Sequence, residues 1–411
     1  MSKLEQKFIN FIQRNIILIG SIILFAISLK IRMSGIEYKS GDYVSFLEPW
    51  FNQIENGGGL ITLKDAIGDY NVPYMFILTI LTYLPVSPLI SIKIVSILFD
   101  YLAASIMSLI VFSLLEDNNI SKTISIITFD IAIFLPTVIL NSSFWAQCDM
   151  IYVTFLLCCI LFLIQDSYIV SFIFFSLALS FKLQAIFIFP VLVILCFANK
   201  KYSILHFFLI PITFSFMLLP ALIANRPLND TLKIYFEQTQ SQKSMTKNYP
   251  NLYILLRGSY DDFHKLAIWL TIAILGFMTI YILYKKWSIC DLNILLLCMW
   301  CAFTCVMFLP SMHDRYGILL DVLSFVYCII ERKKIYMALG INFVSLISYT
   351  SFLIGDCVIQ YQYLAIGNLL LFILITKDFL YQLKLDNQIY KQSSNEIEDI
   401  NIVLDNIEIQ K

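Results

Sequence analysis

The feature that most constrains this chain is a series of long apolar runs, each close to the length that crosses a membrane. A bilayer core about 30 Å thick needs roughly 20 apolar residues per helix. Such runs, which we interpret as uncharged spans, occur at about residues 15–31, 88–115, 122–141, 148–165, 203–224, 264–284, 289–309, 316–331, 334–355 and 358–376. We therefore predict an all-α polytopic membrane protein with about 11–13 transmembrane helices and a structured first outer loop.

The composition points in the same direction. Hydrophobic residues make up 59% of the 411 residues and charged residues 14%, against roughly 45–50% and about 25% in an ordinary globular chain. A soluble body of this size would lack the polar residues needed to cover its surface. The net charge of −1 gives no basic field for nucleic acid, so membrane lipid is the expected surrounding and no nucleic-acid partner is expected.

One apolar stretch, 168–197, is longer than a single span and is interrupted by Lys182. We interpret it as two short helices, at about 168–181 and 183–198, that meet near one membrane surface. A charge at the bilayer centre costs about 2.5–3.5 kcal/mol, so Lys182 is expected at a water-exposed edge. There it is either a snorkelling side chain or a functional cation.

Lysine and arginine in the short loops set the expected orientation. With the N-terminus in the cytoplasm, the basic loops all fall on the inner side: Lys122, Lys200, Lys201, Lys285, Lys286, Arg332, Lys333 and Lys334. The C-terminal tail 377–411 falls there too, as a surface helix or a disordered segment without assigned chemistry. The longer segments 32–87, 141–148, 225–263 and 310–315 then face outward, so the active site is expected on the outer face. The Ile, Asn and Lys content and the short loops are typical of a bacterial cytoplasmic (plasma) membrane protein.

Polar residues gather in these outer segments. Asp42 lies only about ten residues beyond the first span, and Asp69 follows in the same loop. A solvated loop with Gly-Asp turns is the alternative interpretation of both. The apolar stretch 73–85 is too short to span and predicts an interfacial or re-entrant helix.

Two more outer segments carry candidate residues. The turn with Trp145, Gln147 and Asp149 is also compatible with an aromatic-belt anchor whose aspartate caps the next helix. The turn at 309–316 packs His313, Asp314 and Arg315 beside Tyr316. Arginine offers a planar fork suited to phosphate or carboxylate.

On this topology the acidic and basic residues of the outer segments share one side of the membrane: Asp42, Asp69, Asp149, Lys182, His313 and Arg315. Cations near carboxylates at a membrane surface suit a lipid-phosphate substrate and a hydroxyl nucleophile. The cations hold the departing phosphate, and a carboxylate takes the proton of the attacking hydroxyl. This combination predicts sugar transfer from a lipid-phosphate carrier.

The motifs resemble those of the GT-C superfamily of polytopic glycosyltransferases, in particular bacterial relatives of the second mannosyltransferase of GPI-anchor synthesis. The resemblance rests on four short segments in the family's order: Gly41-Asp42-Tyr43 with Phe46-Leu47-x-Pro49-Trp50, Trp145-Ala146-Gln147-Cys148-Asp149, Leu177-Ala178-Leu179-Ser180-Phe181-Lys182-Leu183-Gln184-Ala185, and Leu309-Pro310-x-Met312-His313-Asp314-Arg315-Tyr316. It implies a GT-C-like catalytic domain over 1–376 that includes the outer loops 32–87 and 225–263.

The resemblance also implies roles. Asp42 is the expected general base, and Lys182 and Arg315, with His313, are expected at the donor phosphate. The remaining polar candidates are expected in the substrate site: Tyr43, Asp69, Trp145, Gln147, Asp149, Gln184 and Tyr316. Many GT-C branches carry two adjacent acids in the first loop, whereas Tyr43 follows Asp42 in this chain. That departure puts a metal-dependent variant in doubt, so no metal ligand or cofactor is assigned.

The resulting hypothesis is an inverting glycosyltransferase. It moves a hexose such as mannose from a polyprenyl-phosphate donor, undecaprenyl phosphate in a bacterium, to a cell-surface glycan or lipid-linked acceptor. One alternative is a lipid-linked saccharide flippase or transporter, which would place charges near the mid-membrane between inverted repeats. Another is a polysaccharide polymerase or ligase that uses a lipid-diphosphate donor.

Overall fold

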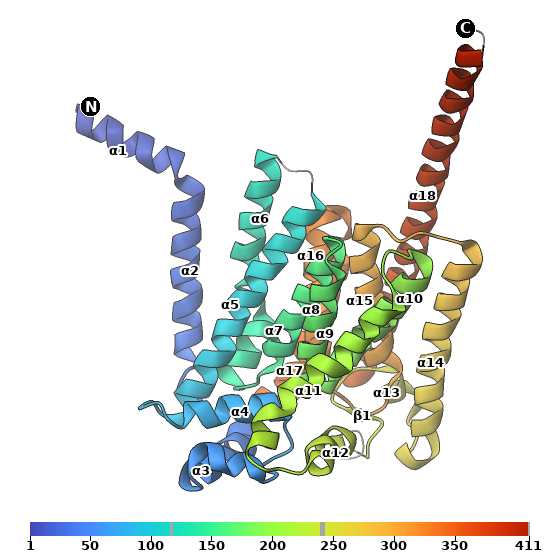
Figure 1. Cartoon of the computed structure of the whole chain (residues 1–411). Coiled ribbons are helices and arrows are strands. Elements are labelled where there is room, and N and C mark those ends of the chain that lie inside the picture. Colours follow the sequence, from blue (N-terminus) through green and yellow to red (C-terminus); the bar gives the residue numbers. More distant parts are fainter. Residues whose placement is uncertain (116–117, 239–242, 410–411) are drawn as a thin grey trace.

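The computed structural model describes residues 1–115, 118–238 and 243–409, and the side chains of described residues up to 389. The chain is 80% helical and forms a bundle of apolar helices, which confirms the predicted all-α polytopic membrane protein. The start of α1 and the end of α18 lie at one end of the bundle, whereas α3, α4, α12 and β1 lie at the other, which we name the loop end (Figure 1). Residues that the sequence places far apart therefore meet at the loop end.

The first half of the chain contains the elements α1 Lys3–Arg14, α2 Ile16–Ser34, η1 Tyr43–Leu47, α3 Glu48–Asn56, η2 Gly59–Lys64, α4 Val72–Leu81, α5 Pro88–Leu114, α6 Asn119–Ala132, α7 Pro136–Ile139, η3 Leu140–Phe144, α8 Asp149–Ile164, α9 Tyr168–Phe181, η4 Leu183–Ile188 and α10 Phe189–Ala198. The second half contains η5 Ile204–Phe208, α11 Leu209–Ile223, α12 Leu228–Gln238, β1 Thr246–Lys247, α13 Leu252–Leu256, α14 Tyr260–Lys285, α15 Asp291–Phe308, β2 Met312–His313, η6 Asp314–Gly317, α16 Ile318–Ile330, η7 Arg332–Lys334, α17 Ile335–Leu353 and α18 Tyr361–Ile409.

Seven of the described helices are long and apolar enough to cross a membrane, or eight if α6 and the helix after its 47° bend count as one span. The sequence predicted about 11–13, because each apolar run counts as a span when only its length is known. The runs at 148–165 and 168–198 instead form helices of 10–17 residues, and α16 has 13. The predicted short helix at 73–85 is present as α4, which lies across the bundle axis (Figure 1).

Four charged residues lie well inside runs that were predicted to be uncharged spans, away from the ends of those runs, and all four are buried: Lys93, Asp100, Asp130 and Asp321. Each has a partner. Asp100 forms an ion pair with Arg32 at 3.1 Å, and Lys93 donates to two backbone oxygens just after α2. Asp130 and Asp321 accept hydrogen bonds from serines of α2 and α17. Since lipid is as apolar as leucine, such polar contacts add to close packing in joining the helices.

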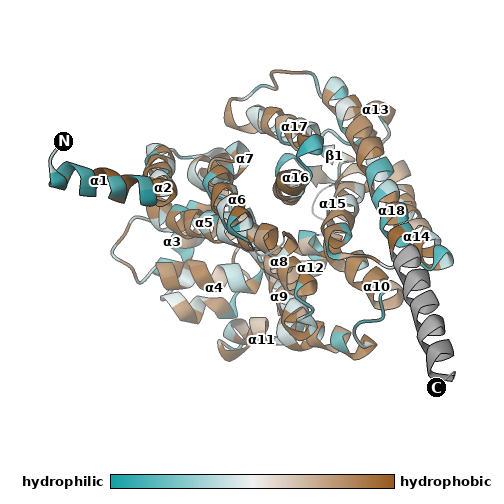
Figure 2. Ribbon diagram, turned by 90° about the horizontal axis from the view of Figure 1, so that it is seen from above, coloured by the Kyte–Doolittle hydropathy of each residue, from teal (hydrophilic) through white to brown (hydrophobic). Residues whose placement is uncertain are grey.

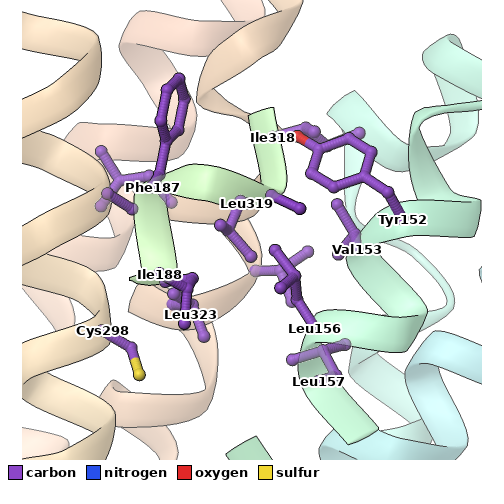
Figure 3. Packing of buried hydrophobic residues seen from close by; sticks show 14 of the residues in the cluster. Tyr152, Val153, Leu156, Leu157, Phe187, Ile188, Cys298, Ile318, Leu319 and Leu323 are labelled. Atoms are coloured by element: carbon purple, nitrogen blue, oxygen red, sulfur yellow. The ribbon is translucent and has the colours of Figure 1, made fainter. Parts of the chain in front are cut away.

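The centre of the bundle is α8, nearly all of whose residues are buried. Tyr152 and Leu156 of α8 lie beside Leu319 of α16, and Ile188 of η4 lies close to Leu323 (Figure 3). Tight packing of this kind leaves η4 little freedom to move. The residue immediately before η4, Lys182, is therefore held at a fixed point.

The loop end is closed by a small parallel pairing between β1 and β2, with Thr246 opposite Met312 and Lys247 opposite His313. This pairing ties the segment after α12 to the turn that carries His313. Viewed along the bundle, α1 extends sideways from α2 and away from the other helices (Figure 2).

Candidate active site

A cavity of about 400 Å³ opens at the loop end. Seven segments contribute its walls: Asp42, Phe46, Leu47 and Trp50; Asp69 and Tyr70; Gln147; Phe181, Lys182, Leu183, Gln184, Ile186 and Phe187; Gln238; Tyr260 and Ile268; and Leu309, Pro310, Ser311, Met312, His313, Arg315 and Tyr316. All four segments of the family resemblance therefore meet at this cavity. The walls are mainly apolar, and the charged groups are confined to a few positions.

Asp42 is fixed through one of its two carboxylate oxygens. Oδ2 accepts hydrogen bonds from Trp145 Nε1 at 2.8 Å, Gln147 Nε2 at 2.7 Å and Arg315 Nη1 at 3.3 Å. Ala146 has a φ of 63°, a strained backbone conformation of the kind that gathers at functional sites. No described residue donates a hydrogen bond to Oδ1, so this oxygen remains available within the cavity wall.

Lys182 occupies the break between α9 and η4, as the sequence predicted. Its backbone is extended, with φ −146° and ψ 136°, and its Nζ donates a hydrogen bond to Asp149 Oδ1. The side chain is only 7% exposed, which excludes the snorkelling alternative. Asp149 lies in the first turn of α8, but its carboxylate is occupied by Lys182 and by Asn141 Nδ2 at 2.9 Å rather than by the helix backbone. The capping interpretation of Asp149 is therefore wrong.

Arg315 connects the two carboxylates. Its Nη1 bonds to Asp42, its Nε lies 3.6 Å from Asp149 Oδ2, and its Cζ lies 5.5 Å from the centre of the Trp145 ring. Nε is buried without a hydrogen-bond acceptor. A guanidinium group carries five N–H donors, and Nη1 is the one nitrogen that hydrogen bonds to a described residue. The group thus keeps donors for a further acceptor.

The other titratable groups of the site have shifted pKa values. Burial lowers the pKa of His313 to about 3, and the positive charge of Arg315 adds to the effect. The imidazole is therefore neutral at pH 7, so His313 can act at a phosphate only as an uncharged hydrogen-bonding group. Burial raises the pKa of Asp314 to about 7 and raises that of Asp69 above its ordinary value.

Three residues expected in the substrate site do not line the cavity: Tyr43, Trp145 and Asp149. Tyr43 is 1% exposed, and its hydroxyl lies 3.4 Å from Glu48 Oε1. Trp145 is also 1% exposed and stacks on Phe352 with ring centroids 4.1 Å apart. These side chains are enclosed by neighbouring helices, so they position the cavity wall. Asp69, Gln147, Gln184 and Tyr316, which were also expected in the substrate site, do line the cavity.

Sequence reasoning missed Tyr70. Its hydroxyl donates to Gln147 Oε1 at 2.8 Å, and its ring lies 5.2 Å from Lys182 Nζ. It therefore touches both the amide that holds Asp42 and the cation that holds Asp149. One signal was present, because Gly-Asp-Tyr occurs both at 41–43 and at 68–70.

Asn141 and Gln238 were missed as well. Asn141 supports Asp149 as described above, and Gln238 of α12 donates to the backbone oxygen of Asp69 at 2.6 Å and to Asn71 Oδ1 at 2.8 Å. Neither amide lies in a motif, so only the fold places it.

Within the described part of the chain, no group of three or more His, Cys, Asp or Glu side chains is arranged to hold a metal ion. The arrangement instead provides a carboxylate, two cations and apolar walls. No family model matches the chain, and no curated protein matches its sequence.

Proposed function

We propose that the protein is an inverting glycosyltransferase that moves a hexose from a polyprenyl-phosphate donor to a glycan or lipid-linked acceptor. The observation that carries the proposal is the anchored carboxylate of Asp42, which faces a cavity shared with Lys182 and Arg315. The motif resemblance to the GT-C superfamily supports the same activity.

The geometry of Asp42 suits a general base. Three donors hold Oδ2 and fix the orientation of the carboxylate, while Oδ1 is free to accept a proton. In the proposed reaction, Oδ1 takes the proton of the acceptor hydroxyl. The acceptor oxygen then forms a bond to the anomeric carbon as the bond from that carbon to the phosphate oxygen breaks. The electron pair leaves with the polyprenyl phosphate, and the anomeric configuration is inverted.

The leaving phosphate would be received by Lys182 and Arg315. An ammonium group has three N–H donors, and Lys182 donates one described hydrogen bond, to Asp149. Arg315 keeps Nε without an acceptor. A neutral His313 at the cavity wall adds a hydrogen-bonding group without charge. Donors fixed before the reaction stabilise developing negative charge at no cost of reorganisation.

The apolar walls suit a lipid carrier. Ile186 and Ile268, each 40% exposed, lie on the side formed by η4 and α14, and Phe46 and Trp50 lie on the side formed by the first loop. A polyprenyl chain is apolar along its length, so these side chains would cover it. We place the loop end on the outer face of a bacterial cytoplasmic membrane and both termini inside, because the basic short loops favour that orientation.

The two alternatives predict different outcomes of one experiment. A flippase moves its lipid-linked sugar without making a bond, and a polymerase or ligase requires a lipid diphosphate. The candidate cavity gathers its charges at one end of the bundle rather than at the mid-membrane position typical of a transporter. The structure offers no comparable support for either alternative.

The test uses purified protein in proteoliposomes with radiolabelled undecaprenyl-phosphate mannose or glucose and a lipid extract as acceptor. We expect Asp42→Asn to reduce transfer by about 10²–10⁴-fold, the usual contribution of a general base. The amide oxygen can replace Oδ2 toward its donors, so the fold should persist. Glu55→Gln, an exposed change in the same loop, is the matched control and should transfer at the wild-type rate.

Wild-type transfer by Asp42→Asn would remove the base from the proposal. Label that crosses the bilayer without entering a new product would support the flippase. Transfer from undecaprenyl-diphosphate sugar alone would support the polymerase or ligase.

A further inference from the structure

The N-terminal helix α1 contains no buried residue, and Ile12 is the one residue in it that is partly covered. Leu4, Phe8 and Phe11, spaced by four and three residues, form one apolar face and are 79%, 62% and 60% exposed. Lys3 and Lys7 lie together along one edge of this face. The helix is fixed by a capping box at its start and extends sideways from α2 (Figures 1 and 2). An amphipathic helix joined to a membrane span in this way lies in the membrane interface.

A groove of about 650 Å³ lies between α2, α5 and α6, and only the last residues of α1 reach it. Its polar end is formed by the junction of α1 and α2, and the rest is largely apolar: Gln13, Arg14 and Asn15, followed by Ile16, Ile17, Leu18, Ser21, Ser105, Ser108, Leu109, Ile126 and Phe129. The groove lies at the opposite end of the bundle from the candidate active site, so it is a separate site.

The three serines that line the groove already donate hydrogen bonds to neighbouring groups of the protein. Ser21 Oγ donates to Asp130 at 2.7 Å, Ser108 Oγ to the backbone oxygen of Ser125 at 2.6 Å, and Ser105 Oγ to the backbone of its own helix. The hydroxyl protons of these serines are therefore donated within the bundle. The floor of the groove therefore presents an apolar surface to whatever fills it.

Arg14 marks the polar end. It forms no ion pair with any described residue. It lies on the same edge of α1 as Lys3 and Lys7, so the three positive charges are on one side of the helix. The three cations and the single acid of the helix, Glu5, give α1 an excess of positive charge. An apolar groove between membrane spans that ends at an unpaired arginine matches a molecule with an apolar chain and an anionic head.

We propose that this groove binds an anionic phospholipid of the leaflet at the termini end of the bundle. One acyl chain lies between α2 and α5, against Leu109, and the phosphate group lies at Arg14. The face of Leu4, Phe8 and Phe11 enters the same leaflet beside it. The site is independent of glycosyl transfer and would persist if that activity were absent.

The test is a titration of the purified, delipidated full-length chain with phosphatidylglycerol or phosphatidylcholine of identical acyl chains, followed by native mass spectrometry. We expect one tightly bound phosphatidylglycerol. Since a cation near a membrane surface contributes about 1 kcal/mol toward an anionic lipid, Arg14→Gln should weaken that binding about fivefold. Lys265→Gln, the same type of change at an exposed site on α14, should leave it unchanged.

A second pair of variants tests the groove itself. Leu109→Trp fills the space and should abolish the tightly bound lipid, whereas Leu98→Trp, on the same helix but outside the groove and 55% exposed, should retain it. Equal binding of the two lipids by wild type, or unchanged binding by Arg14→Gln, would overturn the anionic headgroup site. A tightly bound lipid that survives Leu109→Trp would overturn the groove as its location.

Discussion

The buried pair of Lys182 and Asp149 makes a quantitative prediction about stability. Their side chains are 7% and 1% exposed, and Lys182 is the partner of Asp149 Oδ1. Lys182→Met keeps a long unbranched side chain but leaves Asp149 without that partner. Removal of one member of a buried pair costs about 3–5 kcal/mol. Because Asn141 and Arg315 still face Oδ2, we expect the low end, about 3 kcal/mol.

An exposed pair gives the matched control. Lys201 Nζ lies 3.0 Å from Asp166 Oδ1, but the two side chains are 47% and 58% exposed. Exposed pairs contribute about 0–1 kcal/mol, since water screens them. Lys201→Met removes the same functional group and should therefore have little effect on the free energy of unfolding.

The assay is equilibrium unfolding in mixed micelles with increasing SDS fraction, followed by tryptophan fluorescence. The variant Asp149→Asn and the double variant with Lys182→Met complete a cycle. We expect the double variant to be about 0.5–3 kcal/mol more stable than the sum of the single effects, since neither charge is then left unpaired. A cost for Lys182→Met no larger than that for Lys201→Met would refute the reasoning. So would single effects that add within about 0.5 kcal/mol.

Three further predictions concern the loop end. Gly68 has a φ of 66°, and an added Cβ would lie 2.6 Å from the Trp50 ring. Gly68→Ala should therefore lower the free energy of unfolding by about 1–3 kcal/mol in the same assay. An unchanged unfolding midpoint would contradict this backbone conformation. Tyr70→Phe removes the hydrogen bond to Gln147. It should lower the free energy of unfolding by about 1 kcal/mol and slow transfer in the proteoliposome assay. A wild-type free energy of unfolding together with a wild-type transfer rate would exclude a positioning role for Tyr70. Burial raises the pKa of Asp314 from 3.8 to about 7, so its contribution to stability is complete below pH 3.8 and is lost as the pH rises toward 7. Asp314→Asn should abolish that decline between about pH 4 and 7, as measured by unfolding midpoints across this range, and an identical profile would contradict the shift.

The positions of the helices could be predicted because apolar runs and interruptions are local features. For Lys182 the break in the helix could be predicted, but its partner could not. The cost of a charge in lipid predicted a break at that residue, and α9 does end at Phe181. Its partner could not be predicted, because Asp149 lies 33 residues away and meets Lys182 only through the packing of α8 against α9.

The charges within spans show the opposite case. Asp100 and Arg32 are 68 residues apart and fully buried against one another. Hydropathy averaged over a span conceals a single charge, so the run that contains Asp100 was predicted to be uncharged. The lengths of the helices could not be predicted for a related reason, since an apolar run carries no information about where a short helix ends inside the bundle.

The anchoring of Asp42 has a consequence for biosynthesis. Its three donors lie 103, 105 and 273 residues further along the chain. Chains emerge from the ribosome N-terminus first, and early segments fold before later ones exist. Asp42, Asp149 and Lys182 are thus made well before Arg315, and until then the nascent loop end contains one more carboxylate than cation among these groups. Synthesis of η6 supplies the missing positive charge, so a chain stopped earlier has its loops but no completed site. The last quarter of translation therefore decides whether an inserted chain becomes a functional protein.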